Sequence, residues 1–310
     1  MAASPSSGSV PTRGTLASGQ SKEELYPASG RFPRKGYYRF RMTIAFDGTH
    51  YAGWQFQLSG LAVQQCVETA LKALFPGSLG VHGCSRTDAG VHALGLVAHA
   101  DVPREEFRIP IRKLILALNA HLPEDIRVQK VSRCPQDFHA QYQAHSKEYR
   151  YQVWNHPGMN PLLIARAWHV AKTLDLVSMR RAAALFVGKK DFRSFACNHD
   201  QFIENTVRTL TRCQIQKRGH LLTFVIEGNG FLYKMCRSIV GTLVQVGLGR
   251  YTPSDVETMF EKRDRESAGM SAPAEGLTLW KVSYRAESKK ELEQSAKNAK
   301  LCSTWKGTRE

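Results

Sequence analysis

The chain has 310 residues, of which 42% are hydrophobic and 23% charged, and its formal net charge is +16 at pH 7. This length can bury a sizeable core, and no apolar run approaches the roughly 18 residues that a membrane-spanning helix needs. The excess of positive charge predicts a polyanionic partner, with nucleic acid ahead of an anionic membrane surface.

The spacing of the cysteines and histidines indicates neither a disulfide framework nor a metal site. The seven cysteines are odd in number and include no C-x-x-C pair, and the eleven histidines include no H-E-x-x-H motif. Disulfide-rich secreted proteins and zinc domains depend on regular spacings of this kind. We therefore expect a soluble intracellular protein with reduced thiols and no bound metal.

The N-terminal residues 1–36 are rich in Ser, Gly, Pro and Ala without apolar periodicity, which predicts disorder. Acidic residues are absent before Glu23, whereas Arg13 and Lys22 are basic. This composition is compatible with an organelle transit peptide, and a plain flexible tail explains it equally well. The location therefore stays open between an organelle (plastid or mitochondrion) and the cytoplasm.

A strand, a loop and a helix are predicted next. In Tyr38–Phe46, apolar residues alternate with polar ones such as Arg39, a pattern typical of a strand with one buried face. The segment Tyr51–Gln57, Y-A-G-W-Q-F-Q, follows as a loop whose aromatic residues either join the core or border a functional cleft. Apolar residues at helical spacing predict a helix from Val63 to Leu74, which a Pro-Gly pair ends.

The stretch Cys84–Ala93, C-S-R-T-D-A-G-V-H-A, is predicted to form a loop between the strands Val81–Cys84 and Gly95–Asp101. A loop carboxylate such as Asp88, with a guanidinium two residues away at Arg86, can serve as a nucleophile or a general base. The simpler alternative is a turn in which Asp88 caps backbone N–H groups and pairs with Arg86.

A helix that begins near Pro110 and a strand over Ile126–Val131 complete the first half of the chain. The order strand, helix, strand, loop, strand, helix, strand is typical of a split β-α-β arrangement. We therefore expect an α+β fold, with residues 37–145 as the N-terminal half of the catalytic domain.

The second half, residues 146–285, begins with a strand over Lys147–Trp154. Tyr149 and Tyr151 lie on the same face of that strand, and by composition alone both are core aromatics. A set of further elements follows, namely a helix that ends at Gly188, strands over Thr209–Gln216 and Leu221–Glu227, a helix over Phe231–Leu248, and a helix that starts at Thr252-Pro253.

Arg237 lies among largely apolar neighbours in the helix predicted for Phe231–Leu248. If this arginine is partly buried it needs an acidic partner, and the alternative is that it lies at the surface. Beyond this helix, residues 286–310 alternate Lys and Glu without an apolar face, which predicts a charged flexible tail that adds RNA affinity.

Four stretches together resemble the signatures of the TruA-type tRNA pseudouridine synthases. These stretches are S-R-T-D-A-G-V-H-A around Asp88, K-x-Y-x-Y at Lys147–Tyr151, N-T-V-R-T at Asn205–Thr209, and G-N-G-F-L-Y-K-M-C-R ending at Arg237. They occur in the family's order and at the family's spacing between Tyr38 and about Tyr284.

The resemblance implies roles for individual residues. Asp88 is the catalytic residue, Arg237 pairs with it from the other half, Arg86 helps to displace the uridine, and Tyr149 stacks on the target base. Lys147 supports a phosphate or Tyr149. The resemblance also implies a set of RNA contacts, formed by Tyr149, Lys147, Phe138, His139, Gln141, Tyr142, Arg208 and Leu277.

Two of these implied contacts need comment, because one residue differs from the family pattern and the other has a second explanation. Gln141 stands where the family has an arginine, which predicts that one phosphate contact is missing or weaker. Arg208 is equally well explained as a solvated strand end.

The same resemblance implies a fold and a partner. We expect two similar split β-α-β (ferredoxin-like) halves whose sheets merge into one mainly antiparallel sheet, with a central basic cleft between them. We also expect a homodimer that binds the anticodon arm of tRNA and isomerises uridine to pseudouridine near nucleotides 38 to 40.

In the expected reaction, Asp88 breaks the N1–C1′ bond of the uridine by attack on the sugar or by proton abstraction from it. The uracil then reattaches through C5. Because no group leaves and nothing is oxidised, no cofactor or metal is expected. Two other functions remain open, namely a non-catalytic RNA-binding or RNA-folding protein on this scaffold and the same isomerisation on ribosomal or messenger RNA.

Overall fold

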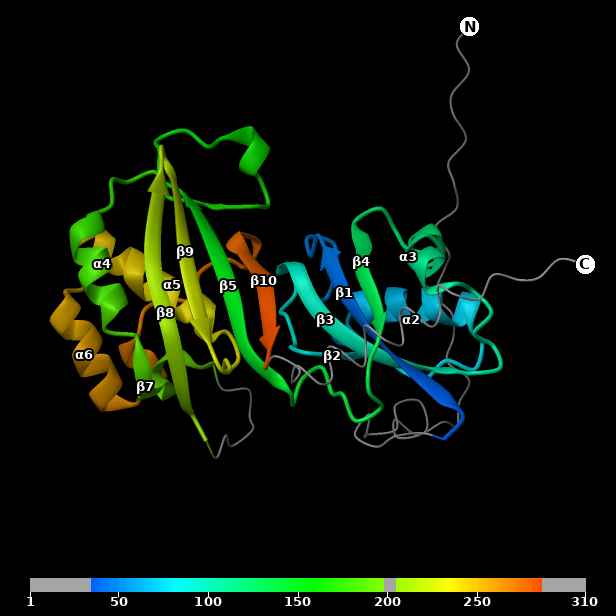
Figure 1. Ribbon diagram of the computed structural model, residues 1–310. Helices are drawn as coiled ribbons and strands as arrows, with labels where there is room; N and C mark the ends of the chain where they lie inside the picture. Colours follow the sequence, from blue (N-terminus) through cyan, green and yellow to red (C-terminus); the bar gives the residue numbers. More distant parts are fainter. Residues whose placement is uncertain (1–34, 198–204, 286–310) are drawn as a thin grey trace, which may run out of the picture.

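The computed structural model describes residues 35–197 and 205–285, and in this part of the chain one sheet forms with helices packed against it. Its strands follow the order β4-β1-β3-β10-β5-β9-β8-β7, while the short strands β2 and β6 pair with β3 and β5. All strand pairs are antiparallel except β3–β10 and β5–β6. In the view of Figure 1, α2 and α5 lie behind the strands. The predicted α+β fold with one mainly antiparallel sheet is confirmed.

The first half of the chain alternates strands and helices. In chain order it contains β1 (Tyr37–Phe46), α2 (Val63–Leu74), β2 (His82–Gly83), β3 (His92–Pro103), α3 (Ile111–Ala120) and β4 (Ile126–Arg133). These strands lie in the order β4-β1-β3-β2. That order belongs to the β-α-β-β-α-β arrangement expected from the sequence.

The second half repeats the arrangement. Its main elements are β5 (Ala144–Trp154), β6 (Trp168–His169), α4 (Leu176–Ala184), β7 (Gly188–Asp191), β8 (Val207–Arg218), β9 (Leu221–Gly228), α5 (Met235–Gly247), α6 (Pro253–Lys262) and β10 (Leu277–Tyr284). The short 3₁₀ helices are η1 (Pro161–Leu163), η2 (Arg193–Phe195), η3 (Arg265–Ser267) and η4 (Ala274–Gly276). The order β10-β5-β9-β8 matches that of the first half, strand for strand, so the two halves are similar.

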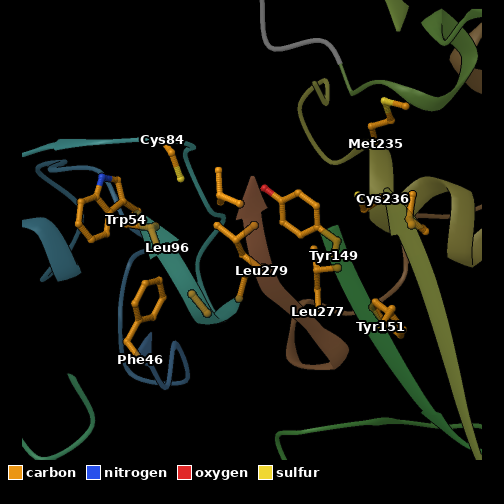
Figure 2. Close-up of a cluster of buried hydrophobic side chains, with 14 of the residues drawn as sticks. Phe46, Trp54, Cys84, Leu96, Tyr149, Tyr151, Met235, Cys236, Leu277 and Leu279 are labelled. Atoms are coloured by element: carbon orange, nitrogen blue, oxygen red, sulfur yellow. The ribbon is translucent and has the colours of Figure 1, made fainter. Parts of the chain in front are cut away.

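The last strand, β10, joins the two halves. It pairs along its length with β5 of its own half and, at Thr278–His92 and Leu279–Ala93, with β3 of the other. Figure 2 shows the apolar side chains that meet there, with Phe46, Trp54 and Leu96 from the first half and Tyr149, Tyr151, Met235 and Cys236 from the second on either side of Leu277 and Leu279. The buried residues of both halves form one hydrophobic cluster.

Arg39 departs from the expected pattern of β1. The alternation places it on the polar face, yet the residue is only 2% exposed. Its Nε and Nη2 each donate to an Asp101 carboxylate oxygen at 2.7 Å, and its Nη1 donates to the Phe138 carbonyl oxygen at 2.9 Å. Arg39 and Asp101 lie directly opposite each other on β1 and β3, so the strand register places this ion pair.

Two element boundaries also differ from the prediction. The strand that leaves the Asp88 loop begins at His92 and not at Gly95, because it pairs with both β1 and β10. The helix expected from Phe231 begins at Met235, because Lys234 has φ +56° and cannot extend the helix toward the N-terminus. At α6 the prediction is confirmed, since Thr252 caps the helix and Pro253 is its first residue.

Other predictions concern the limits of the domain. The predicted extension 1–36, except for Lys35 and Gly36, and the predicted tail 286–310 lie outside the described residues. The predicted division between residues 145 and 146 falls at the start of β5. Within residues 35–197 and 205–285, no helix is both long and apolar enough to cross a membrane.

The buried pair Arg39–Asp101 provides the first testable prediction. Asp101→Ala leaves the Arg39 guanidinium buried without its carboxylate, so we expect the free energy of unfolding to fall by about 3–5 kcal/mol. Equilibrium urea denaturation followed by circular dichroism measures the change. The control is Arg263→Ala, which breaks an ion pair whose arginine side chain is 65% exposed and is expected to cost less than about 1 kcal/mol. Equal losses in the two variants would contradict the prediction.

Candidate active site

A second loop clamps the segment that carries Asp88. The backbone N–H of Trp54 donates to the Thr87 carbonyl oxygen at 3.3 Å. Gly53, with φ +92°, lies so close that a Cβ atom added to it would be 2.3 Å from the same oxygen. Only glycine fits there, because both the space and the positive φ exclude a side chain. The approach of these two loops fixes the backbone immediately before Asp88.

The backbone after Asp88 is fixed in the same way. Gly90 has φ +77° and allows the chain to turn, so that the N–H of Val91 donates to the Asp88 carbonyl oxygen at 3.2 Å. The N–H of Gly90 donates to the Tyr51 carbonyl oxygen at 3.3 Å. The carboxylate is therefore presented from a rigid turn held on both sides, directly before β3 begins.

Asp88 forms an ion pair with Arg237 from the other half of the chain. The Nη1 atom of Arg237, in the first turn of α5, donates to Oδ2 of Asp88 at 2.8 Å, and the side chains are 14% and 18% exposed. The Nε atom of Arg237 donates to the Ala272 carbonyl oxygen at 2.7 Å, which orients the guanidinium. The pair is the one predicted, and Arg86 is not the partner of Asp88.

Tyr149 packs beside this pair on β5. Its side chain is buried, its hydroxyl lies 3.0 Å from Ser85 Oγ in the Asp88 loop, and its ring meets the edge of Phe231 at 4.9 Å. Figure 2 shows the hydroxyl directed toward the side of the cluster where Cys84 lies. Burial strongly raises the pKa of the Tyr149 hydroxyl, so this group remains a neutral phenol at physiological pH. The tyrosine therefore provides an aromatic surface and not a base.

These residues surround a cleft of about 870 Å³. Its lining includes, among the predicted site residues, Asp88, Arg86, Tyr149, Lys147, Gln141 and Leu277. The other charged residue in the lining is Lys234, so three cations and one acid face the space. The volume is in the range of small-molecule sites, and the charge suits a phosphate-bearing ligand.

Four predicted RNA-contacting residues do not line the cleft. Phe138 is 7% exposed and packs on Tyr284, and His139 is 8% exposed and accepts hydrogen bonds at Nδ1 from the backbone N–H groups of Gln141 and Tyr142. This turn places the exposed Gln141 at the cleft. Their implied RNA contacts stay predictions.

Tyr142 and Arg208 lie at the surface or near it. The Tyr142 ring packs on His139 with 4.2 Å between centroids and is 58% exposed. Arg208 donates through Nη1 to the carbonyl oxygens of Asn205 and Val207 at the start of β8, at 3.0 and 2.8 Å. The RNA contacts implied for these two residues also stay predictions.

No site role was predicted for one part of the cleft wall. Phe231, Leu232, Tyr233 and Lys234 line the cleft as a loop because α5 begins four residues later than its periodicity indicates. No local signal marks a lysine with φ +56°, although the preceding Gly228-Asn229-Gly230 is consistent with a longer turn.

The loop Tyr51–Gln57 contributes both to the core and to the cleft, which were the two alternatives for its aromatic residues. Tyr51 and Trp54 are buried in the core, whereas Gln55, Phe56 and Gln57 line the cleft.

In the described part of the chain, no group of three or more His, Cys, Asp or Glu side chains is placed to hold a metal ion. The charged groups of the cleft lining are the carboxylate of Asp88 and three cations, next to several amide and hydroxyl side chains.

Comparison with known proteins agrees with this geometry. The family model described as tRNA pseudouridine synthase matches residues 42–143 and 182–285. The chain is 39% identical over 247 residues to tRNA pseudouridine synthase A of Ruminiclostridium cellulolyticum, covering 79% of this chain and 99% of that protein. It is 42% identical over 253 residues to tRNA pseudouridine synthase A of Geobacillus kaustophilus, covering 80% and 95%.

A solved structure of an unknown protein from Galdieria sulphuraria is also similar at 13% identity, covering 73% of this chain and 94% of that one. Its TM-score of 0.19 is too low to support an argument about the fold. The family model and the two relatives span nearly all of the two-half domain that carries Asp88 and Arg237. The chain belongs to the tRNA pseudouridine synthase family.

Proposed function

We propose that this protein is an isomerase that converts uridine to pseudouridine in tRNA. The observation that carries the proposal is the 2.8 Å ion pair between Asp88 and Arg237 at a basic cleft that Tyr149 lines. The family membership and the names of the two relatives, both tRNA pseudouridine synthases, support it. In this proposal the protein acts inside the cell, in an organelle or the cytoplasm.

The chain's own side chains suggest how the steps are divided. Arg86, exposed at the cleft, helps to displace the uridine from its stack, and the base then stacks on Tyr149. Stacking on an aromatic ring offsets the lost base stacking by roughly 1–3 kcal/mol. Asp88, aimed by Arg237, then cleaves the N1–C1′ bond, either by attack on the sugar or by proton abstraction.

The substrate in this proposal is the anticodon arm of tRNA, near nucleotides 38 to 40. A looped strand suits the cleft because a base in a loop is displaced more readily than one in a continuous duplex. Two cations in the lining, Arg86 and Lys234, suit its backbone. Gln141, at the cleft in the position where the family has an arginine, provides a hydrogen bond in place of a charged phosphate contact.

A non-catalytic RNA-binding protein on the same scaffold would need the basic cleft and Tyr149. It would not need a carboxylate that is oriented by an arginine at 2.8 Å from the opposite half of the chain. Because a partly buried charge pair is costly to maintain, its presence at a cleft favours a functional role for the carboxylate. The geometry therefore favours the enzyme.

The proposed function predicts the behaviour of Asp88 variants. Asp88→Ala and Asp88→Asn should lower the rate of pseudouridine formation at least about 10²-fold, because the reacting carboxylate is absent, while tRNA affinity stays within about threefold. The assay measures tritium released from tRNA transcripts labelled at C5 of uridine, since C5 loses its hydrogen when it bonds to C1′.

The control for this experiment is Glu257→Gln, which alters an exposed acid on α6 and should behave as wild type. Equal RNA binding with no product from the wild type would overturn the enzyme proposal and favour the non-catalytic alternative. Transcripts of ribosomal and messenger RNA in the same assay test the other alternative. We expect product from the tRNA alone.

Arg237 variants separate charge from orientation. Arg237→Lys keeps a positive charge but cannot donate to both Asp88 and the Ala272 carbonyl oxygen, so we expect kcat to fall at least about tenfold. Arg237→Met should lower kcat at least about 10²-fold, since the carboxylate loses its partner. Single-turnover rates at saturating tRNA measure both. A wild-type rate in Arg237→Met would contradict the assigned role.

We further propose that the protein is a homodimer, as the resemblance to the family implies. Sedimentation velocity at micromolar concentration is expected to show a species of twice the 34.7 kDa chain mass, both free and with tRNA. A monomer alone at every concentration would overturn this part of the proposal and leave the isomerase proposal in place.

A further inference from the structure

Lys147 is the most deeply buried cation in the cleft lining. It lies on the face of β5 that also carries Tyr149, two residues further on, and it is only 9% exposed. Within the described residues its ammonium group makes no hydrogen bond or ion pair, whereas Arg237 is paired with Asp88. A largely buried ammonium without an anion is costly, because the charge has lost much of its water and gained no partner.

The groups near Lys147 do not neutralise it. Cys84, from the loop after β2, is buried, and burial raises the pKa of its thiol, so the thiol stays uncharged at neutral pH. Burial also lowers the pKa of Lys147; the neighbouring Cys84 acts in the opposite direction, and the positive charge of Arg208 on β8 adds to the lowering. An anion that arrives in the cleft would therefore relieve an unfavourable charge.

The isomerisation generates such an anion. When the N1–C1′ bond breaks, its electron pair passes to the uracil, and the negative charge spreads from N1 to the two carbonyl oxygens. C5 then forms a bond to C1′, C5 loses its proton, and N1 gains one, so that atoms and electrons balance without a co-reactant. The charge on the detached ring is largest before C5 reattaches.

We propose that Lys147 is a catalytic residue that stabilises the negative charge on the uracil ring after the glycosidic bond breaks. The inference rests on the proposed function. A base stacked on Tyr149 lies beside Lys147, because side chains two apart on one strand are separated by about 7 Å. A preformed cation at the place where charge develops lowers the barrier without reorganisation during the reaction.

The depth of the side chain argues for the base and against a phosphate. A flat ring enters a narrow space between side chains, whereas a phosphodiester carries its sugars and remains near solvent. The cleft already offers less buried cations for the backbone, namely the exposed Arg86 and the half-buried Lys234. Lys147 is left as the cation placed for the part of the substrate that leaves the stack.

The test compares Lys147→Met with Lys147→Arg in the full-length protein. For Lys147→Met we expect the single-turnover rate at saturating tRNA to fall about 10²-fold or more, with tRNA affinity within about threefold of wild type. Lys147→Arg should react at least about tenfold faster than Lys147→Met, because the arginine returns a positive charge. The urea midpoint of Lys147→Met should equal or exceed that of wild type, since an unpaired buried charge has been removed. Lys72→Met, at an exposed position on α2, is the matched control.

A pH profile provides a second readout. The protonated ammonium is the active form, so kcat/KM of the wild type should fall as pH rises through the lowered pKa of Lys147. Lys147→Arg should lack that fall, because a guanidinium stays charged. Ionisation of the uridine itself is common to both proteins and cancels in the ratio of their rates.

Other outcomes overturn the inference in recognisable ways. Weaker tRNA binding with a salt dependence reduced by about one counterion, at an unchanged rate, would make Lys147 a phosphate contact. If Lys147→Met and Lys147→Arg both lowered the urea midpoint and the rate together, the role of Lys147 would be structural. A wild-type rate in Lys147→Met overturns this inference alone, whereas a wild type that makes no product overturns the proposed function as well.

Discussion

The ion pair between Asp88 and Arg237 requires the two halves of the chain to meet in one register. The two residues are 149 positions apart, and only two residue pairs link β3 to β10 where the halves join. The segment before β10 contacts both halves. Ala272 holds Arg237, the Tyr151 hydroxyl donates to the Pro273 carbonyl oxygen at 2.8 Å, and His92 Nε2 lies 3.0 Å from the Glu275 carbonyl oxygen. One segment thus positions the arginine and anchors the end of the loop that carries the acid.

The cleft combines features that weaken a fold with a core that compensates for them. Lys147 is a buried cation without a partner among the described residues, and Lys234 has a left-handed backbone that costs roughly 1 kcal/mol or more. A continuous hydrophobic cluster that runs beneath both halves offsets these costs. Such local violations in an otherwise consistent structure are expected where a protein binds and reacts with its substrate.

Periodicity predicted many of the helices and strands, and the resemblance to the family predicted how they assemble. The alternation in β1 and the caps of α6 followed from residue types at regular positions, whereas the merged sheet and the partner of Asp88 were expected from the resemblance. The late start of α5 did not, because a left-handed Lys234 is decided by packing and not by propensity. The buried Arg39 could not be predicted either, since its partner lies on a strand 62 residues away. Local patterns specify elements, whereas contacts between distant segments depend on the assembled sheet.

The repeated strand order has a consequence for how many reaction centres one chain holds. In the first half, the connection from β2 to β3 is the long loop that presents Asp88; in the second, the equivalent connection from β8 to β9 is the tight hairpin Gly219-His220. Arg237, in turn, comes from the helix whose counterpart in the first half is α3. Each copy of the motif thus supplies one member of the Asp88–Arg237 pair. The internal duplication is functionally asymmetric, and within the described chain it yields a single composite centre and not two equivalent ones.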